Sequence, residues 1–421
     1  MKRNTTMLRL AAVATATALA LAACGSSSDD SDDTKKDTAS KSDGVLTVGS
    51  LLPQTGSLAF LGPPEFAGVD LAVKDINAAG GVLGKDVVHV KGDSGDTDSG
   101  IAPDETDKLL KAGSDVIVGA ASSGVSMTVI DKIMSAGSIM FSPANTSTAF
   151  DEKPYGVDLY FRTAPSDVLQ GAVMSNLLIE DGRKNVAILA RQDAYGETLA
   201  EQVKKGLEAA GSKVAITEFY GEKATNYDSQ VAAVADAKPD AIVLIAFEET
   251  TSIIPKLVEA GVAPKDVPTY FVDGNTADYK GKLDDGVLAG VKGTIPGADA
   301  GDAFKKRLLE VDPSLKDYSY AGESYDAVVV SALAAIAAKS DAGDKIAAKL
   351  IDVTTGGEKC TTFEACKALL DADPSADIDY DGVSGPIEFG KTGSPTSASI
   401  GIYEYGKDNT YKAVKFIKGD I

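Results

Sequence analysis

The chain has 421 residues, 44% of them hydrophobic, and a formal net charge of −21. This length and apolar content allow two domains of ordinary size, each with its own core. A chain this negative repels nucleic-acid phosphates and anionic lipid, which argues against a nucleic-acid partner.

The first 44 residues indicate export and a membrane anchor. Lys2 and Arg3 precede an Ala/Leu-rich run, residues 10–23, which is too short to span a bilayer and has the charge pattern of a secretory signal. The run ends in LAACG and resembles the lipobox of bacterial lipoproteins, in which the cysteine, here Cys24, is lipidated and the chain is cut just before it. We therefore predict a signal peptide over 1–23 and a lipidated, flexible tether over 24–44, on the extracytoplasmic face of the cell membrane.

Two successive blocks of alternating strands and helices follow the tether. Strands are predicted over 45–52, 86–90, 115–118 and 138–142, and again over 185–189, 213–219, 241–246 and 268–272. Amphipathic helices are predicted between them, over 65–79, 105–112, 197–210, 229–235 and 251–260. This alternation favours parallel sheets covered on both faces, and the two blocks predict two α/β lobes with a cleft between them.

Ligands of open parallel sheets bind beyond the carboxyl ends of the strands. The loop VGAASSGVS, residues 118–126, lies at such an end and precedes a helix. On these residues alone Ser122, Ser123 and Ser126 favour a helix cap, because serine is a preferred N-cap and turn residue. Binding of a ligand by the same hydroxyls stays open at this point.

The remaining polar motifs argue against metal, cofactor and enzyme chemistry. Cys360 and Cys366 lie close together in an exported chain and are predicted to form a disulfide, and the single histidine, His89, is far from both. A Ser-His-Asp arrangement would need His89, which lies inside a predicted strand, and no G-x-S-x-G surrounds a serine. The stretch AGGVLGKD, residues 79–86, departs from a nucleotide-binding loop at both ends and is typical of a helix C-terminus.

No later apolar run is expected to span a membrane; in the best candidate, 328–338, Ser331 interrupts the run.

Several segments, in order and spacing, resemble the branched-chain amino-acid-binding family of periplasmic binding proteins, the capture subunits of ABC importers. They are VGSLLPQTGSLAFLGPPEFAGVDLAVKDINAAGGVLGKDV, VIVGAASSGVS, FSPANTSTAF, FRTAPSD, DAYGETLAEQVKKGLEAAG and AGESYDAVVVSALA. The resemblance implies a type I fold, two Rossmann-like lobes joined by three hinge crossovers near 163–164, 294–295 and 393–397. Lobe one is then 45–163 with 295–394, and lobe two is 164–294 with 395–421.

The same resemblance implies a ligand site. Ser123, the backbone N–H of Ala144, and Thr146 match the positions that hold the α-carboxylate, and Tyr195 and Asp273 match those that meet the α-ammonium. An Asx turn before Gly274 is the alternative role for Asp273.

Two positions depart from the family pattern. Phe247 stands where a second tyrosine is usual, and Asp273 replaces the longer glutamate. Phe60 and Leu61 are expected to line the side-chain pocket, while Leu58 is expected only to pack against the lobe.

The resulting hypothesis is a monomeric, lipid-anchored binding protein that is not an enzyme. It delivers an amino acid, by preference branched-chain, to an ABC permease. Other amino acids, amides and aromatic acids stay open as ligands, as does a sensor role on the same fold. If the purified protein turned over a substrate, the hypothesis of an extracytoplasmic hydrolase would be favoured again.

Overall fold

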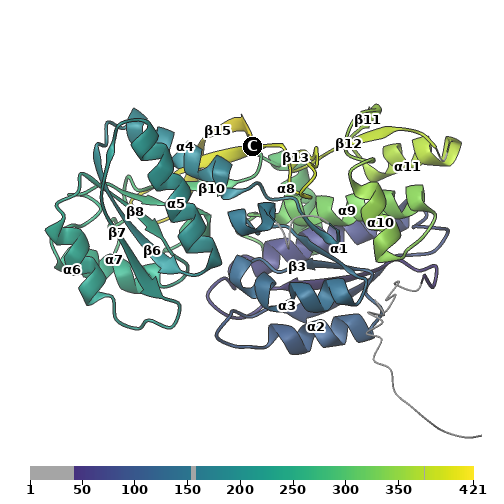
Figure 1. Ribbon diagram of the computed structural model, residues 1–421, viewed down its shortest axis with the longest axis horizontal. Helices are drawn as coiled ribbons and strands as arrows, with labels where there is room; N and C mark the ends of the chain where they lie inside the picture. The colour runs from purple at the N-terminus through teal and green to yellow at the C-terminus, as the bar shows by residue number, and fades with distance from the viewer. Residues whose placement is uncertain (1–41, 153–157, 374) are drawn as a thin grey trace, which may run out of the picture. The chain divides into compact units, whose positions relative to one another are not determined.

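The structure is a computed structural model that describes residues 42–152, 158–373 and 375–421 (Figure 1). The predicted signal peptide, Cys24 and nearly all of the predicted tether therefore lie outside the described residues. Two large β-sheets and one small sheet organise the rest of the chain.

The first sheet has five strands, all parallel, in the order β2-β1-β3-β4-β5. Its strands are β1 (Thr47–Leu52), β2 (Val88–Asp93), β3 (Val116–Gly119), β4 (Ile139–Ser142) and β5 (Tyr160–Arg162). Its helices are α1 (Gly62–Ala78), α2 (Ala102–Lys111), α3 (Ser123–Ser135), α8 (Gly301–Val311), α9 (Ala321–Ala338), α10 (Gly343–Leu350) and α11 (Phe363–Ala372). Successive residues of one strand point to opposite faces, so Val116 and Val118 pack in the core with α1 and α9 while Ile117 packs with α2 and α3.

The second sheet has seven strands in the order β15-β14-β10-β9-β8-β6-β7. Its strands are β6 (Asn185–Gln192), β7 (Lys213–Gly221), β8 (Ala241–Ile245), β9 (Thr269–Phe271), β10 (Lys292–Pro296), β14 (Ser397–Tyr405) and β15 (Tyr411–Asp420). Its helices are α4 (Asp167–Glu180), α5 (Ala194–Ala209), α6 (Asp228–Asp236) and α7 (Thr250–Glu259). Ile188 faces α4 and α5, and Leu189 faces α6 and α7.

The elements predicted between residues 45 and 272 are confirmed, with ends that differ by a few residues. The all-parallel prediction is wrong for one edge of the second sheet, where β14 runs antiparallel to both β10 and β15. The turn between β14 and β15 is too short for a crossover connection, so these two strands must pair as a hairpin.

Helix α9 is the one helix among the described residues that is long and apolar enough to cross a membrane, by length and composition only. The sequence prediction had underestimated it, because the helix begins before residue 328 and Ser331 does not interrupt it: the Ser331 hydroxyl donates to the Ala327 carbonyl oxygen at 2.7 Å. The apolar window is 83% buried inside the protein, as expected for a core helix.

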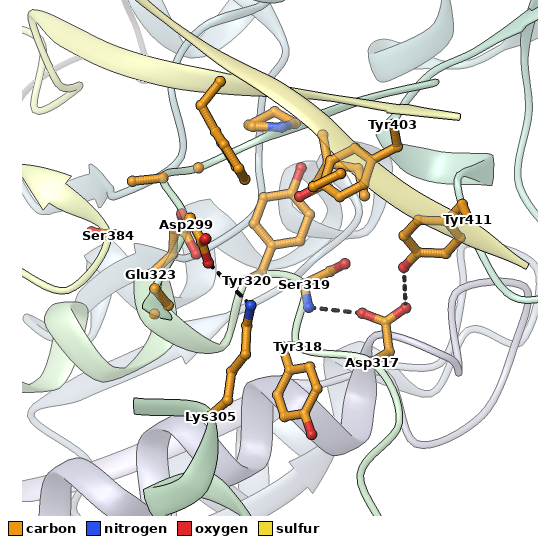
Figure 2. A pocket seen from close by; sticks show the side chains of 18 of the residues that line it. Asp299, Lys305, Asp317, Tyr318, Ser319, Tyr320, Glu323, Ser384, Tyr403 and Tyr411 are labelled. Atoms are coloured by element: carbon orange, nitrogen blue, oxygen red, sulfur yellow. Dashed lines mark hydrogen bonds and ion pairs between the residues drawn. The ribbon is translucent and has the colours of Figure 1, made fainter. Parts of the chain in front are cut away.

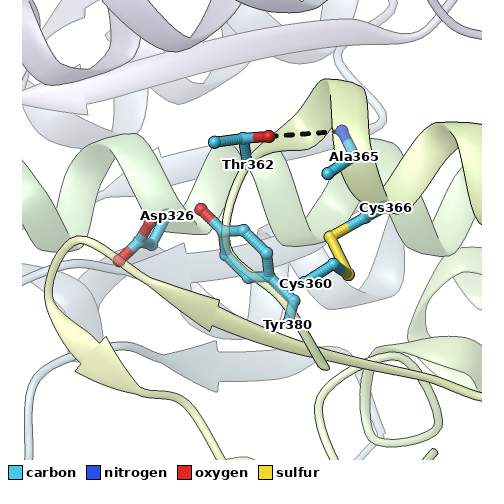
Figure 3. Close-up of a disulfide and its surroundings, with 6 residues drawn as sticks. All are labelled: Asp326, Cys360, Thr362, Ala365, Cys366 and Tyr380. Atoms are coloured by element: carbon cyan, nitrogen blue, oxygen red, sulfur yellow. Dashed lines mark hydrogen bonds between the residues drawn. A yellow bond between two sulfur atoms is a disulfide. The ribbon is translucent and has the colours of Figure 1, made fainter. Parts of the chain in front are cut away.

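A small sheet of β11 (Glu358–Cys360), β12 (Ile378–Gly382) and β13 (Gly385–Pro386) lies beside α9 and α11, and two short 3₁₀ helices, η1 (Thr148–Asp151) and η2 (Asp273–Asn275), lie in loops. The sulfur atoms of Cys360 and Cys366 are 2.06 Å apart and link β11 to α11 (Figure 3). The Thr362 hydroxyl caps α11 by accepting from the Ala365 N–H at 3.2 Å.

Candidate functional site

Loops at the carboxyl ends of strands from the two large sheets meet around one cavity. Its lining residues are Leu58, Leu61, Ala121, Ser122, Ser123, Ala144, Tyr195, Phe247, Asp273, Gly274 and Tyr320. All the residues predicted to contact the ligand are among them except Thr146 and Phe60. The open space is about 20 Å³, which is room for about one water molecule.

The three serines of the loop 118–126 have separate roles. Ser122 is the N-cap of α3, and its hydroxyl accepts from the Val125 N–H at 3.4 Å. The buried Ser126 hydroxyl donates to the Ala120 carbonyl oxygen, also at 3.4 Å. Ser123 lines the cavity at the first turn of α3, where the positive end of the helix dipole favours an anion. Ser122 therefore caps the helix and also lines the cavity, while Ser123 lines the cavity and its binding of a ligand stays a prediction.

The second predicted carboxylate-binding segment is held in place by Ser142. Its hydroxyl oxygen accepts from the N–H groups of Ala144 at 3.2 Å and Asn145 at 2.9 Å. The Ala144 N–H is therefore already bonded in this structure, and the residue lines the cavity.

Thr146 is fully buried but does not line the cavity. Its hydroxyl lies beside Asp167 at the start of α4. Burial raises the pKa of Asp167 to about 8, and the negative charge of Asp273 adds to the rise, while a hydrogen bond from the Thr198 hydroxyl at 3.0 Å opposes it. The Asp167 carboxyl group beside Thr146 therefore favours its neutral form.

Asp273 is the buried carboxyl group of the cavity, with 7% of its surface exposed. Its oxygens accept from the hydroxyls of Tyr195 at 2.6 Å and Tyr320 at 2.7 Å, and from the Gln170 side-chain amide at 2.9 Å. Burial raises the pKa of Asp273, and these three hydrogen bonds work against the rise. No cation among the described residues forms an ion pair with it within 4.0 Å.

Sequence reasoning missed Tyr320 and Gln170. Tyr320 immediately precedes α9, and Gln170 lies on α4, both far in sequence from Asp273. Tyr320 stands one residue before the AGESYDA segment, which was the only signal that could have drawn attention to it. For Gln170 the sequence offers no such signal.

Aromatic rings form the wall beside Asp273. Tyr195 and Phe247 stack with centroids 5.5 Å apart, and the Arg191 guanidinium lies 3.6 Å from the centroid of Phe247. A side chain at position 274 would collide with this wall, because a Cβ there would lie 2.7 Å from the Phe247 ring. The Asp193 carboxylate caps α5 by accepting from the N–H groups of Tyr195 and Gly196, which fixes the start of the helix that carries Tyr195.

The loop before α1 supplies aliphatic side chains to the same cavity. Leu58 and Leu61 both line it, whereas Phe60 is only half-buried and packs against the core around β6 and β8. The roles expected for Leu58 and Phe60 are therefore exchanged, while Leu61 lies where it was expected.

One arrangement contradicts the sequence analysis. Ser50 Oγ lies 2.8 Å from His89 Nε2, and His89 Nδ1 lies 2.8 Å from Asp70 Oδ1, which is the connectivity of a Ser-His-Asp triad. The reasoning from position inside a strand was wrong, because the neighbouring parallel strand β1 brings Ser50 to His89 and helix α1 brings Asp70. Ser50 is nevertheless fully buried, so a substrate carbonyl cannot reach its hydroxyl, and the partly exposed Asp70 also pairs with Lys91 at 2.6 Å.

Comparison with known proteins places this geometry in context. A family model described as "Periplasmic binding protein" matches residues 45–407. "Leu/Ile/Val-binding protein homolog 3" of Brucella melitensis biotype 1 is 31% identical over 191 residues, which are 45% of this chain and 50% of that protein, so the chain spans half of that relative's length.

Two further relatives align over most of the chain. The "leucine-, isoleucine-, valine-, threonine-, and alanine-binding protein" of Pseudomonas aeruginosa is 26% identical over 86% of this chain and 90% of its own length. The "chemotactic signal transduction system substrate-binding protein BasB" of Halobacterium salinarum is 26% identical over 82% of this chain and 83% of its own length.

Solved structures share the fold. The substrate-binding protein LivJ of Streptococcus pneumoniae, in complex with isoleucine, has a TM-score of 0.70 at 20% identity and covers 90% of this chain and 100% of its own. A solute-binding protein of R. palustris in complex with benzoate has a TM-score of 0.70 at 19% identity and covers 90% of this chain and 98% of its own. The predicted fold class, two Rossmann-like lobes joined by crossovers, is confirmed.

Proposed function

Because the chain belongs to the periplasmic binding protein family, we propose that it captures an amino acid, branched-chain by preference, between its two lobes. Like its relatives, it is a substrate-binding protein of the ABC-transporter type and not an enzyme. The proposed ligand site is the cavity around Ser123 and Asp273.

The observation that carries the proposal is the position of Asp273. It is a buried carboxyl group with only neutral partners, across one small cavity from Ser123 at the N-terminus of α3. A zwitterion satisfies both ends, because its ammonium pairs with the carboxylate while its own carboxylate meets a hydroxyl and free N–H groups at the helix start. A plain carboxylic acid would leave Asp273 unpaired in the closed cavity.

The lining beside these polar groups supports an aliphatic side chain. Leu58, Leu61 and Phe247 present apolar surface to the cavity and are each no more than 5% exposed. Hydrophobic walls of this kind favour leucine, isoleucine or valine over polar amino acids. The names of the Brucella and Pseudomonas relatives agree with this choice.

A ligand can enter only if the walls separate, because about 20 Å³ is far less than an amino acid needs. Contacts at the rim join loops of the two lobes: the Lys223 ammonium lies 3.3 Å from an Asp98 carboxylate oxygen, and the Thr97 hydroxyl bonds to Glu222. The exposed Lys223–Asp98 pair contributes little free energy, whereas opening also breaks the buried hydrogen bond between Tyr320 of lobe one and Asp273 of lobe two. A ligand that bridges both lobes then shifts the population toward the closed form.

The proposal extends to the protein's place in the cell. We propose that Cys24 carries a lipid, that residues 24–44 tether the body to the extracytoplasmic face of the cell membrane, and that a monomer delivers its ligand to an ABC permease. The support for the anchor is the sequence around Cys24. The support for the permease is family membership.

Two alternatives have specific observations in their favour. The relative named as part of a chemotactic signal transduction system favours a sensor role, in which the same closure is detected by a receptor. The stacked rings of Tyr195 and Phe247, together with the benzoate-bound neighbour, favour an aromatic acid as the ligand.

Mass spectrometry of small molecules released from the purified protein, followed by calorimetric titration, tests the proposal. Leucine, isoleucine and valine are expected to bind one-to-one, with benzoate and alanine as comparison ligands. Binding of benzoate in preference to every amino acid would move the ligand to the aromatic acids. Binding of none of these ligands would contradict the proposed function.

A further inference from the structure

A second and larger cavity, separate from the ligand cleft but sharing Tyr320 with it, lies against the β14–β15 hairpin (Figure 2). We call it the hairpin cavity; its walls are residues 295–300, residues 316–323, and the side chains of β14 and β15 that face them. Its volume is about 370 Å³, which is within the range of small-molecule sites. The β10 to α8 connection and the segment that leads into α9 both border it.

Aromatic rings make up one wall of the hairpin cavity. Tyr403 contacts Tyr411 edge to face at 5.4 Å between centroids and Phe416 at 6.2 Å. Phe416 is 36% exposed, so part of this aromatic wall is open to solvent. Tyr320 adds a fourth ring to the lining.

Carboxyl groups surround these rings. Asp317 accepts from the Tyr411 hydroxyl at 2.8 Å and from the Ser319 N–H at 2.7 Å, so both of these partners are neutral. Asp299 pairs with Lys305 at 3.0 Å, and Glu323 is buried beside them. The four acidic side chains of the lining outnumber its two lysines, Lys305 and Lys316.

The charge of Asp317 acts on the aromatic wall of the cavity. Burial raises the pKa of the Tyr403 hydroxyl, and the negative charge of Asp317 raises it further. Asp317 therefore acts on the ring that contacts both Tyr411 and Phe416. A cation placed there would meet both the faces of aromatic rings and carboxylate oxygens.

We infer that the hairpin cavity is a second ligand site, and that it takes a small organic cation: an ammonium group attached to an apolar body. Tyrosine and phenylalanine rings attract an ammonium through their quadrupole, and Asp317 supplies a charge-assisted hydrogen bond. An anion is disfavoured by the same charges. The inference does not depend on what the cleft binds.

The position of Tyr320 links the two sites. Its side chain lines both cavities, and its hydroxyl bonds to Asp273 in the cleft. A molecule in the hairpin cavity that moves this ring also moves a partner of Asp273. By linkage, each ligand must then alter the affinity for the other by the same factor.

A matched pair of probes tests the site on the full chain: 2-phenylethylamine, a cation at pH 7, and 2-phenylethanol, its neutral counterpart. Calorimetric titration should show one molecule of the amine bound per chain, at least fivefold more tightly than the alcohol. Asp317→Asn, which keeps a hydrogen-bond acceptor but removes the charge, should weaken amine binding at least fivefold, and Tyr403→Leu should weaken it too. Asp420→Asn, the same change at an exposed position of the same hairpin, should leave it unaltered.

Circular dichroism of each variant checks that it folds, and Tyr403→Leu and Asp317→Asn serve as independent tests. Equal affinity for amine and alcohol, no binding at millimolar concentration, or wild-type binding by both cavity variants would overturn the inference. Loss of amine binding in Asp273→Asn with retention in Asp317→Asn would place the amine in the cleft and overturn it as well.

Discussion

The substitution Asp273→Asn separates the charge of the ligand site from its shape. The amide has nearly the same size and can accept hydrogen bonds from the Tyr195 and Tyr320 hydroxyls, which can also rotate to accept from it. The unliganded protein should therefore fold, and it should be no less stable than the wild type. Removing a buried carboxyl whose pKa is raised by burial takes away a cost of ionisation.

The loss should appear on binding. The ammonium of an amino acid would face a neutral amide, and no other carboxylate contacts it in the lining. Removing one partner of a buried charged pair costs about 2–5 kcal/mol. Because three neutral donors already share the Asp273 charge, we expect the lower part of this range, about 2–3 kcal/mol, which corresponds to a loss of leucine affinity of about thirtyfold or more.

Calorimetry with leucine and with its des-amino analogue 4-methylpentanoate measures the effect. The analogue lacks the ammonium, so its affinity should change far less or should improve in Asp273→Asn. Asp266→Asn, the same change at an exposed position of the same lobe, is the control. Equal losses for the two ligands would refute the assignment of Asp273 to the ammonium.

Four further predictions concern other parts of the chain. Cys24→Ser should release the protein from the membrane and leave leucine affinity unchanged; a variant that stays membrane-bound and lipid-labelled would contradict the anchor. Thiol titration of the unfolded, unreduced protein should find neither Cys360 nor Cys366 reactive, and two free thiols would exclude the disulfide. Burial raises the pKa of Glu323 to about 8, above its unfolded value of about 4.3, so its contribution to stability is complete below about pH 4 and is lost as the pH rises to 8, by up to about 1.4 kcal/mol per pH unit. Chemical denaturation at pH 5.5 and 8.5 should show a smaller fall for Glu323→Gln than for the wild type, and an identical fall would contradict this. Finally, 2-phenylethylamine should change leucine affinity at least twofold through Tyr320; no change would show that the two cavities are independent.

The sequence was most informative where each strand is buried on both faces. The runs 115–118 and 241–246 are continuous apolar segments flanked by helix patterns, and both became central strands. The β14–β15 hairpin was missed because it lies at a sheet edge, where residues such as Val414 and Phe416 are exposed and no helix follows. At such an edge too few residues are buried for the amino-acid composition to indicate a strand.

Within the site, residues on strand-end loops could be predicted, and residues brought in by tertiary packing could not. Asp273 directly follows β9, so its place at the carboxyl edge of the sheet follows from the chain pattern. Gln170 reaches the same carboxylate from the first turn of α4. The contact depends on how α4 packs against the sheet, which no local pattern encodes.

Two buried arginines lie close to the cleft, and their pairing decides how the ligand carboxylate can be held. Arg191 donates to Asp193 at 2.6 Å and to Glu249 at 2.9 Å, and Arg162 is bound by Ser394, by Asp151 and by carbonyl oxygens of residues 145 and 147. Both guanidinium groups are therefore already neutralised, and the carboxylate of the proposed ligand would have to be held by Ser123 and the N-terminus of α3. A helix terminus contributes about 0.3–1 kcal/mol to an anion, against about 1.5–3 kcal/mol for a hydrogen bond to a charged group. The ligand carboxylate would thus be held weakly by lobe one, and a full charge would face the ligand only at Asp273 of lobe two. The affinity would therefore depend on both lobes contacting the ligand at once. A partner that separates the lobes would then break the weaker contact and leave the ligand held by one lobe alone, from which it dissociates more readily.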